Sequence, residues 1–181
     1  GDWDDSGIHG ISRFLARLYR LVLQNADGLR EKSDLSSSDI KDKSVSLNHR
    51  LNSTIKRVTV DIETLDFNTA VAACMELVND LYRIAEEADN RPDLFYHAIK
   101  KLILVMAPLA PHLAEELWQI AGGSGSVFAQ KWPAHDPSAL ELATITMVVQ
   151  INGRLRGSFD VPADIDEQHL CRTNDLQGRH A

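Results

Sequence analysis

Arginines and lysines at helical spacing are the residues of this sequence best suited to binding chemistry. Arg13, Arg17 and Arg20 gather on one side of a segment whose apolar residues recur every three to four positions. A guanidinium offers paired N–H donors to phosphate, so such a strip could contact a nucleic-acid backbone. The alternative is a solvated helix face, which is the commoner fate of charged side chains.

Two further groups of cations have the same potential. His49, Arg50, Lys56 and Arg57 point away from the apolar side of a second segment and form a second basic face. Arg154 and Arg156 follow the dipeptide Asn152-Gly153, a strong signal for a tight turn between strands. The net charge of −7 argues against a generally basic nucleic-acid binder. Residues 1–60 hold ten Lys and Arg against eight Asp and Glu, whereas residues 61–140 hold five against twelve. A polyanionic partner is therefore expected to meet the first third of the chain or a local patch.

Signatures of catalysis and metal binding are absent from the sequence. HExxH, GxSxG and GxGxxG do not occur, and His112 with Glu115 and Glu116 lacks a second histidine ligand. The GGSGS run at 122–126 is not followed by Gly-Lys-Ser/Thr, so a flexible turn is expected there. Cys74 lies in an apolar seam and Cys171 is far from it, which indicates an inert thiol and a reducing compartment. We predict no catalytic residue, metal or cofactor in this chain.

Helices are the elements that must position these cations. Apolar periodicity predicts helices over 6–24, 45–65, 67–88, 92–106 and 111–121, with 25–44 as a flexible loop. The helix ending at Met106 is apolar on most sides and should be the most buried, and Pro108 and Pro111 separate it from the next. Trp118 is expected to pack into the core. The other expected core seams are Ile8, Ile11, Leu15, Leu18 and Val22; Leu47, Leu51, Ile55, Val58, Ile62 and Leu65; and Phe67, Val71, Cys74, Val78, Leu81 and Ala85.

The last part of the chain has a different pattern. A Pro-containing connector spans 131–143, residues 144–151 are β-rich, and a return strand ends at Pro162, so a β-hairpin is expected. We therefore predict a mainly α protein: a bundle of about five helices over 1–142, a hairpin over 143–164, and a disordered or foreign tail over 165–181. No segment is apolar enough for a membrane span or a signal peptide. The missing initiator Met suggests an excised fragment.

Several stretches resemble a known family of enzymes. APLAPHLAEELW, residues 107–118, resembles a segment of the helical anticodon-binding domains of several class I aminoacyl-tRNA synthetases. TIKRVTVDIETLDFNTAVAACMELVNDL, residues 54–81, and VVQINGRLRGSFDVPAD, residues 148–164, are similar to the bundle and the start of the small C-terminal α/β domain of bacterial-type leucyl-tRNA synthetases. The likeness extends from Gly7 to Asp164 and ends there, which implies that this C-terminal domain is truncated.

The resemblance implies a tRNA-docking module. In that family the bundle contacts the tRNA backbone without reading the anticodon, and a separate domain with HIGH-like and KMSKS-like motifs uses ATP and Mg to leucylate tRNA(Leu). Neither motif occurs here, so this fragment alone should be inactive. The implied partners are tRNA(Leu) and the catalytic and editing domains of the same chain, in a monomer of the bacterial cytoplasm or an organelle. The expected tRNA-binding residues are Arg13, Arg17, Arg20, His49, Arg50, Lys56, Arg57, Arg154 and Arg156.

Two alternatives from other classes remain open. One is a non-catalytic helical adaptor that binds protein and whose basic faces are simply solvated. The other is the equivalent domain of a valyl- or isoleucyl-tRNA synthetase. Binding to tRNA that weakens as salt rises would separate the first alternative from a docking module. Preference for a cognate tRNA would decide the second.

Overall fold

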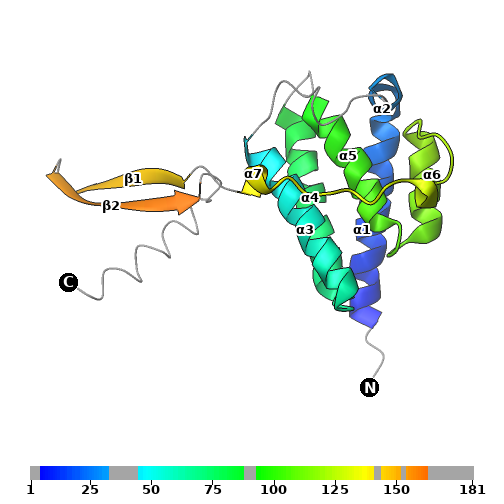
Figure 1. Ribbon diagram of the computed structural model, residues 1–181, viewed down its shortest axis with the longest axis horizontal. Helices are drawn as coiled ribbons and strands as arrows, with labels where there is room; N and C mark the ends of the chain where they lie inside the picture. The colour runs from blue at the N-terminus through cyan, green and yellow to red at the C-terminus, as the bar shows by residue number, and fades with distance from the viewer. Residues whose placement is uncertain (1–4, 33–44, 88–92, 141–143, 152–153, 163–181) are drawn as a thin grey trace. The chain divides into compact units, whose positions relative to one another are not determined.

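The computed structural model describes residues 5–32, 45–87, 93–140, 144–151 and 154–162. The chain divides into two compact units, Gly1–Pro137 and Ser138–Ala181, and each is considered by itself. The first contains the long helices α1 (Asp5–Gln24), α3 (Val45–Glu63), α4 (Phe67–Glu87), α5 (Asp93–Met106) and α6 (Pro111–Ile120), with the short helices α2 (Ala26–Glu31) and η1 (Val127–Ala129) (Figure 1). The mainly helical architecture is therefore confirmed. Within the described residues, none of the helices combines the length and the apolar character that crossing a membrane requires.

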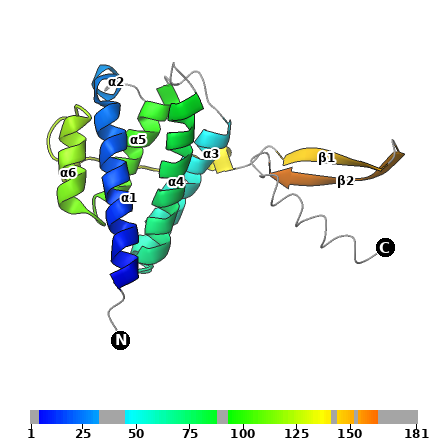
Figure 2. The same cartoon turned by 180° about the vertical axis from the view of Figure 1, so that it is seen from behind.

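Helix α5 lies at the centre of the bundle and contacts α2, α3, α4 and α6 (Figure 2). Its sequence is apolar on most sides, so it can bury side chains against several neighbours at once. All eight residues predicted for its core are buried: Leu94, Phe95, Ala98, Ile99, Leu102, Ile103, Val105 and Met106. Apart from the smaller Ala98, burial of each of these side chains contributes about 1.5–3 kcal/mol. The prediction that this helix is the most deeply packed is thus confirmed.

The buried face of α1 is rotated from the predicted one. Leu18 and Val22 are buried as expected, but Ile11 is 47% exposed, and Phe14 and Leu21 take its place in the core. Apolar residues surround much of this helix, so two overlapping stripes could face inward, and the packing of α4 and α6 against α1 selects between them. The prediction for Ile11 is therefore wrong.

Helix α2 corrects the prediction of a continuous flexible loop over 25–44. It is six residues long and has one buried apolar side chain, Leu29, which is fully enclosed by the core. The Nδ2 of buried Asn25 donates to the carbonyl of Leu21 at 2.7 Å, which ties the start of α2 to the end of α1. A helix this short has no periodic signal and is stabilised mainly by its tertiary contacts. Residues 33–44 lie outside the described residues.

The turn from α3 to α4 exposes one residue at the end of each of the two predicted core seams. Leu47, Leu51, Ile55 and Val58 are buried as predicted, but α3 ends at Glu63, and Leu65 is 71% exposed with φ of 64°. The amide of Asp66 donates to the carbonyl of Asp61 at 2.7 Å, the hydrogen bond of a Schellman motif with Leu65 at its left-handed position. Because the chain reverses here, Phe67 begins α4 at 47% exposure instead of entering the core.

Replacement of Leu65 by glycine should therefore stabilise the bundle by about 1 kcal/mol. Glycine adopts a positive φ without the steric cost that a Cβ imposes, and little apolar contact is lost at so exposed a position. Urea unfolding of the two proteins measures the difference. Leu65→Ala is the matched control: it keeps the Cβ and should give no comparable gain. An equal gain in both variants would assign the effect to the removal of exposed apolar surface.

Helix α6 and the loop after it form a compact turn. Pro111 occupies the first turn of α6, and Gly122, at φ of 76°, ends the helix as predicted. Glu115 Oε2 accepts hydrogen bonds from Ser126 Oγ at 2.9 Å and the Val127 amide at 3.0 Å. Trp118 packs against the core while remaining partly exposed, and Gly123 lies directly against its indole ring. The GGSGS run is therefore a structural turn.

The connector is fastened along α3 before the second unit begins. Trp132 Nε1 donates to Thr59 Oγ1 at 2.9 Å, and the Asp136 amide donates to Asn52 Oδ1 at 2.7 Å. Asn52 and Thr59 are seven residues apart on α3, so they lie on one face of the helix. The predicted connector also contains a short helix, α7 (Pro137–Leu140), which apolar periodicity could not reveal because it has only four residues.

The second unit contains strands β1 (Thr144–Ile151) and β2 (Arg154–Pro162), paired antiparallel from Thr144 with Pro162 to Ile151 with Arg154. The register shifts between Val149 and Gln150. Asn152-Gly153, where the hairpin turn is predicted, and the predicted tail at 165–181 lie outside the described residues.

Candidate functional site

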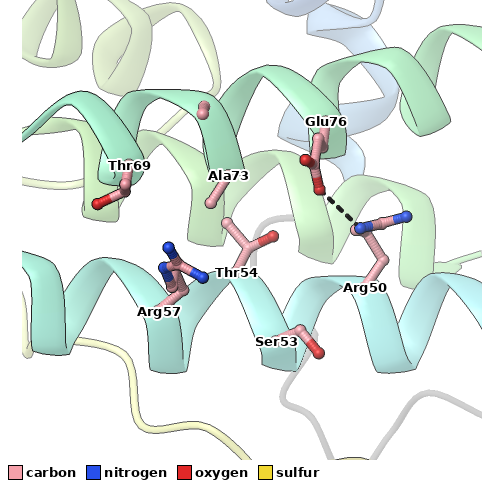
Figure 3. A pocket seen from close by; sticks show the side chains of 8 residues that line it. Arg50, Ser53, Thr54, Arg57, Thr69, Ala73 and Glu76 are labelled. Atoms are coloured by element: carbon pink, nitrogen blue, oxygen red, sulfur yellow. Dashed lines mark hydrogen bonds and ion pairs between the residues drawn. The ribbon is translucent and has the colours of Figure 1, made fainter.

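An open groove between α3 and α4 brings cations and hydroxyls together. Its walls come from matching positions on the two helices, each spaced i, i+3, i+4 and i+7, so each set forms one face. Small side chains in the middle of both walls leave a pocket of about 300 Å³ (Figure 3). Arg50 and Glu76 lie at one end of this groove, and Arg57 and Thr69 at the other. The lining residues are Arg50, Ser53, Thr54, Arg57, Thr69, Ala72, Ala73 and Glu76.

Arg50 is held by two carboxylates of α4. Its Nε donates to Asp80 Oδ2 and its Nη1 to Glu76 Oε2, both at 2.8 Å. The Asp80 side chain is 24% exposed and the Glu76 side chain 61%, so the pair with Asp80 is the better shielded from solvent. Asp80 also accepts from Arg83 Nη2 at 3.2 Å. Arg50 is thus fixed in orientation and partly neutralised.

Arg57 is held in a related way at the other end of the groove. Its Nε donates to Oδ2 of Asp61, one turn further along α3, at 3.1 Å. Asp61 is buried, with a side chain 9% exposed, whereas the Arg57 side chain is 59% exposed. Within the described part of the chain, the Nη2 of Arg50 and both terminal nitrogens of Arg57 have no hydrogen-bond partner. Both arginines therefore combine an anchored Nε with terminal donors that remain available.

The predicted second basic face is two separate stripes. Arg50 and Arg57 line the groove, whereas His49 and Lys56 precede them by one position each and so lie about 100° away around α3. His49 Nε2 is 3.4 Å from Ser53 Oγ, and Lys56 is exposed. The predicted basic face therefore consists of two neighbouring stripes of α3, and the members of each stripe are seven residues apart.

The three arginines of α1 differ in what they contact. Arg13 and Arg20 are exposed, and each donates from Nε to the carbonyl four residues earlier, of His9 and of Ala16, at 3.3 Å. Arg17 instead reaches α4: its Nη1 donates to Asn79 Oδ1 at 2.8 Å, and its guanidinium lies 4.8 Å from the centre of the Tyr82 ring. The Tyr82 hydroxyl donates to the carbonyl of Arg17 at 2.9 Å, so Arg17 helps to fasten α1 to α4.

The last two predicted cations lie on β2. Arg154 is paired with Ile151. Arg156 has no partner residue because Val149 pairs with Gly157 and Gln150 with Leu155, so Arg156 is the extra residue of a β-bulge. The alternation of apolar and polar residues in the sequence does not show such a bulge.

The other groups that the sequence offered as candidates for chemistry are Glu115, beside His112 and Glu116, and Cys74. Glu115 holds the turn after α6, and the described residues contain no group of three or more His, Cys, Asp or Glu that could hold a metal ion. Cys74 is buried in the bundle, and burial raises the pKa of its thiol to about 12, which keeps it protonated and unreactive. The sequence prediction missed Asp61, Glu76 and Asp80 as arginine partners. The i, i+4 spacing of Arg57 and Asp61 could have located the first of these pairs, whereas Glu76 and Asp80 lie on a different helix from Arg50.

Comparisons with known proteins agree on one family. The sequence model described as "Anticodon-binding domain of tRNA ligase" matches residues 46–171. The chain is 41% identical over 183 residues to a leucine–tRNA ligase of Synechococcus sp. (strain JA-3-3Ab), covering 94% of this chain and 21% of the relative. It is 40% identical over 174 residues to that of Syntrophobacter fumaroxidans (strain DSM 10017 / MPOB), covering 93% and 21%. It also resembles a crystal structure of the ternary complex of Agrobacterium radiobacter K84 LeuRS, tRNA and LeuAMS, with a TM-score of 0.73, 31% identity, and coverage of 99% of this chain and 23% of that one. The chain thus spans about a fifth of the length of these relatives.

Proposed function

The chain belongs to the family of anticodon-binding domains of tRNA ligases, and we propose that it is the tRNA-docking module of a leucyl-tRNA synthetase. The observation that carries this proposal is the likeness to a solved leucine enzyme in complex with tRNA, which extends over 99% of the chain. The named relatives are leucine–tRNA ligases, which favours leucine over the valine and isoleucine enzymes.

In this proposal the module positions tRNA(Leu) for a reaction that occurs elsewhere in the parent enzyme. ATP and Mg would act in a catalytic domain with HIGH-like and KMSKS-like motifs, which this sequence lacks. The partners are then tRNA(Leu) and the catalytic and editing domains of the same polypeptide, in a monomeric enzyme of the bacterial cytoplasm. The paired strands are proposed to begin the C-terminal domain of that enzyme, within the predicted division into 1–142, 143–164 and a tail.

The cations would contact phosphates without reading bases, because charge-assisted hydrogen bonds to phosphate fix orientation and carry no sequence information. The proposed contact set remains Arg13, Arg17, Arg20, His49, Arg50, Lys56, Arg57, Arg154 and Arg156. Within this set, the exposure of Arg13 and Arg20 supports a direct role for them more strongly than for Arg17, whose guanidinium contacts Asn79 and Tyr82.

Changing Arg13 and Arg20 together to alanine should raise the Kd for tRNA(Leu) roughly tenfold in the intact enzyme. The slope of log affinity against log salt should become shallower by about 2, since each lost phosphate contact removes about one unit. Filter binding of a tRNA(Leu) transcript at several salt concentrations measures both quantities. The control changes Arg30 and Lys131 to alanine, which removes the same charge outside the proposed contact set. An unchanged Kd and slope in the Arg13/Arg20 variant would count against these contacts and favour a protein-binding adaptor.

A further inference from the structure

The two arginines of the groove share an arrangement that ion pairing alone does not require. Each is bound at Nε by an aspartate, Asp80 at 2.8 Å and Asp61 at 3.1 Å, and both aspartates are shielded from solvent more than the arginines that they hold. Among the described residues, this arrangement leaves both terminal nitrogens of Arg57 and the Nη2 of Arg50 without a hydrogen-bond partner. These nitrogens form part of the planar fork that binds phosphate oxygens in pairs.

We propose that the groove between α3 and α4 binds the phosphodiester backbone of an RNA strand through Arg50 and Arg57, with Asp61 and Asp80 as positioning residues. The inference rests on the proposed tRNA-docking function and adds to it a place, a geometry and a role for acidic residues. Fixing an arginine before the ligand arrives reduces the side-chain entropy lost on binding. The aspartates would therefore strengthen the binding of a polyanion although they carry the same sign of charge.

The dimensions and lining of the groove suit a backbone. Arg50 and Arg57 are seven residues apart, or about 10.5 Å along the axis of α3, so they can meet different phosphates of one strand. Between them the walls are made of small side chains, which leave a pocket of about 300 Å³ open to solvent (Figure 3). The hydroxyl of Ser53 lines the same space and can donate a hydrogen bond to a phosphate or ribose oxygen, whereas that of Thr69 donates to the carbonyl of Asp66 at 2.8 Å.

Glu76 has the opposite role to the two aspartates. It accepts a hydrogen bond from the Nη1 of Arg50 at 2.8 Å, and Nη1 is one of the two terminal nitrogens that could bind a phosphate end-on. Its side chain is 61% exposed, and an exposed ion pair contributes little net free energy, so a phosphate can displace it. Glu76 therefore competes with RNA for Arg50, whereas Asp80 orients Arg50 for RNA.

The experiment compares acid-to-amide variants of the intact enzyme that each remove one negative charge. Coulomb repulsion alone predicts that Glu76→Gln, Asp80→Asn and Asp61→Asn all tighten the binding of a polyanion. We expect Glu76→Gln to lower the Kd for a tRNA(Leu) transcript roughly threefold and the two aspartate variants to raise it roughly threefold to tenfold. Glu63→Gln, an exposed acid on α3 outside the groove, is the matched control and should change the Kd by less than about twofold. Fluorescence anisotropy at one fixed salt concentration measures all four.

A second variant guards against misfolding of the aspartate variants. Changing Arg50 and Arg57 together to lysine keeps both charges and removes the planar forks, so it should raise the Kd roughly tenfold without altering the thermal unfolding midpoint. Tighter binding in all three acid variants would overturn the proposal. So would an unchanged Kd in the acid and lysine variants while the Arg13/Arg20 variant loses affinity, a result that leaves tRNA docking intact. Absence of tRNA binding by the unaltered enzyme would instead overturn the proposed function together with the groove.

Discussion

Truncation of Leu102 to alanine should lower the free energy of unfolding of the helical unit by about 3 kcal/mol. Leu102 is fully buried at the centre of α5, the helix that contacts four others, so its side chain has neighbours on every side. Removing it loses the transfer free energy of the buried methyl and methylene groups and leaves a cavity that the surrounding helices cannot fill completely. Urea unfolding followed by circular dichroism measures the loss.

The same substitution at Leu23 provides the control. Leu23 belongs to α1 and is 51% exposed, so Leu23→Ala should change the free energy of unfolding by no more than about 0.5 kcal/mol. Side-chain chemistry and helix propensity change equally in the two variants, and only the surroundings differ. Losses of similar size at both positions would contradict the placement of α5 at the centre of the core.

Replacement of Gly123 by alanine should cost about 2 kcal/mol, the second large effect on stability. A Cβ at this position would lie 2.1 Å from the ring of Trp118, far inside contact distance. The indole is itself held by packing against the core and by the hydrogen bond from its Nε1 to the Ser124 carbonyl at 3.4 Å. The ring must therefore move or the turn must open, and either change weakens the end of α6.

Gly10→Ala is the matched variant and should have the opposite sign. Gly10 lies inside α1, and a Cβ there would meet nothing within 4 Å. Alanine in a helix interior is more stable than glycine by about 0.5–1 kcal/mol, because glycine loses more backbone entropy on folding. Thermal and urea unfolding of both variants test the pair, and destabilisation by Gly10→Ala would show that the helix is not formed around residue 10.

The sequence predicts the fold best where its pattern leaves little choice. Helix α5 is apolar on most sides and confines His97, Lys100 and Lys101 to one stripe, so the sequence leaves little choice about its core residues. Helix α1 has two overlapping apolar stripes, and only its packing against α4 and α6 determines that Phe14 is buried and Ile11 exposed. Short elements such as α2 carry too few residues for any period. Helix α2 forms because the completed core encloses its one buried side chain, Leu29. Six residues of sequence do not show that this side chain will be enclosed.

For the candidate site as well, the sequence shows the residue types but not their contacts in the fold. The sequence identifies the arginines, because their type and helical spacing are visible. It does not show which of their nitrogens are occupied, since the partners of Arg50 lie 26 and 30 residues away on α4. It also does not show that Arg17 contacts α4 through Asn79, which depends on the crossing of two helices. The number of arginine nitrogens that are free to bind a ligand thus depends on the tertiary structure, and a count of basic residues in the sequence overestimates it.

The burial of Cys74 makes the modification rate of its thiol a measure of how often the helical core opens. A thiol that is fully enclosed and held protonated cannot react with a disulfide reagent until the helices around it separate. Its modification rate is then the intrinsic rate of an exposed thiol multiplied by the fraction of molecules that are open, and each 1.4 kcal/mol of opening free energy slows it about tenfold. With Cys171 replaced by serine, the time course of labelling measures the opening equilibrium under native conditions at a buried position of α4 in the core.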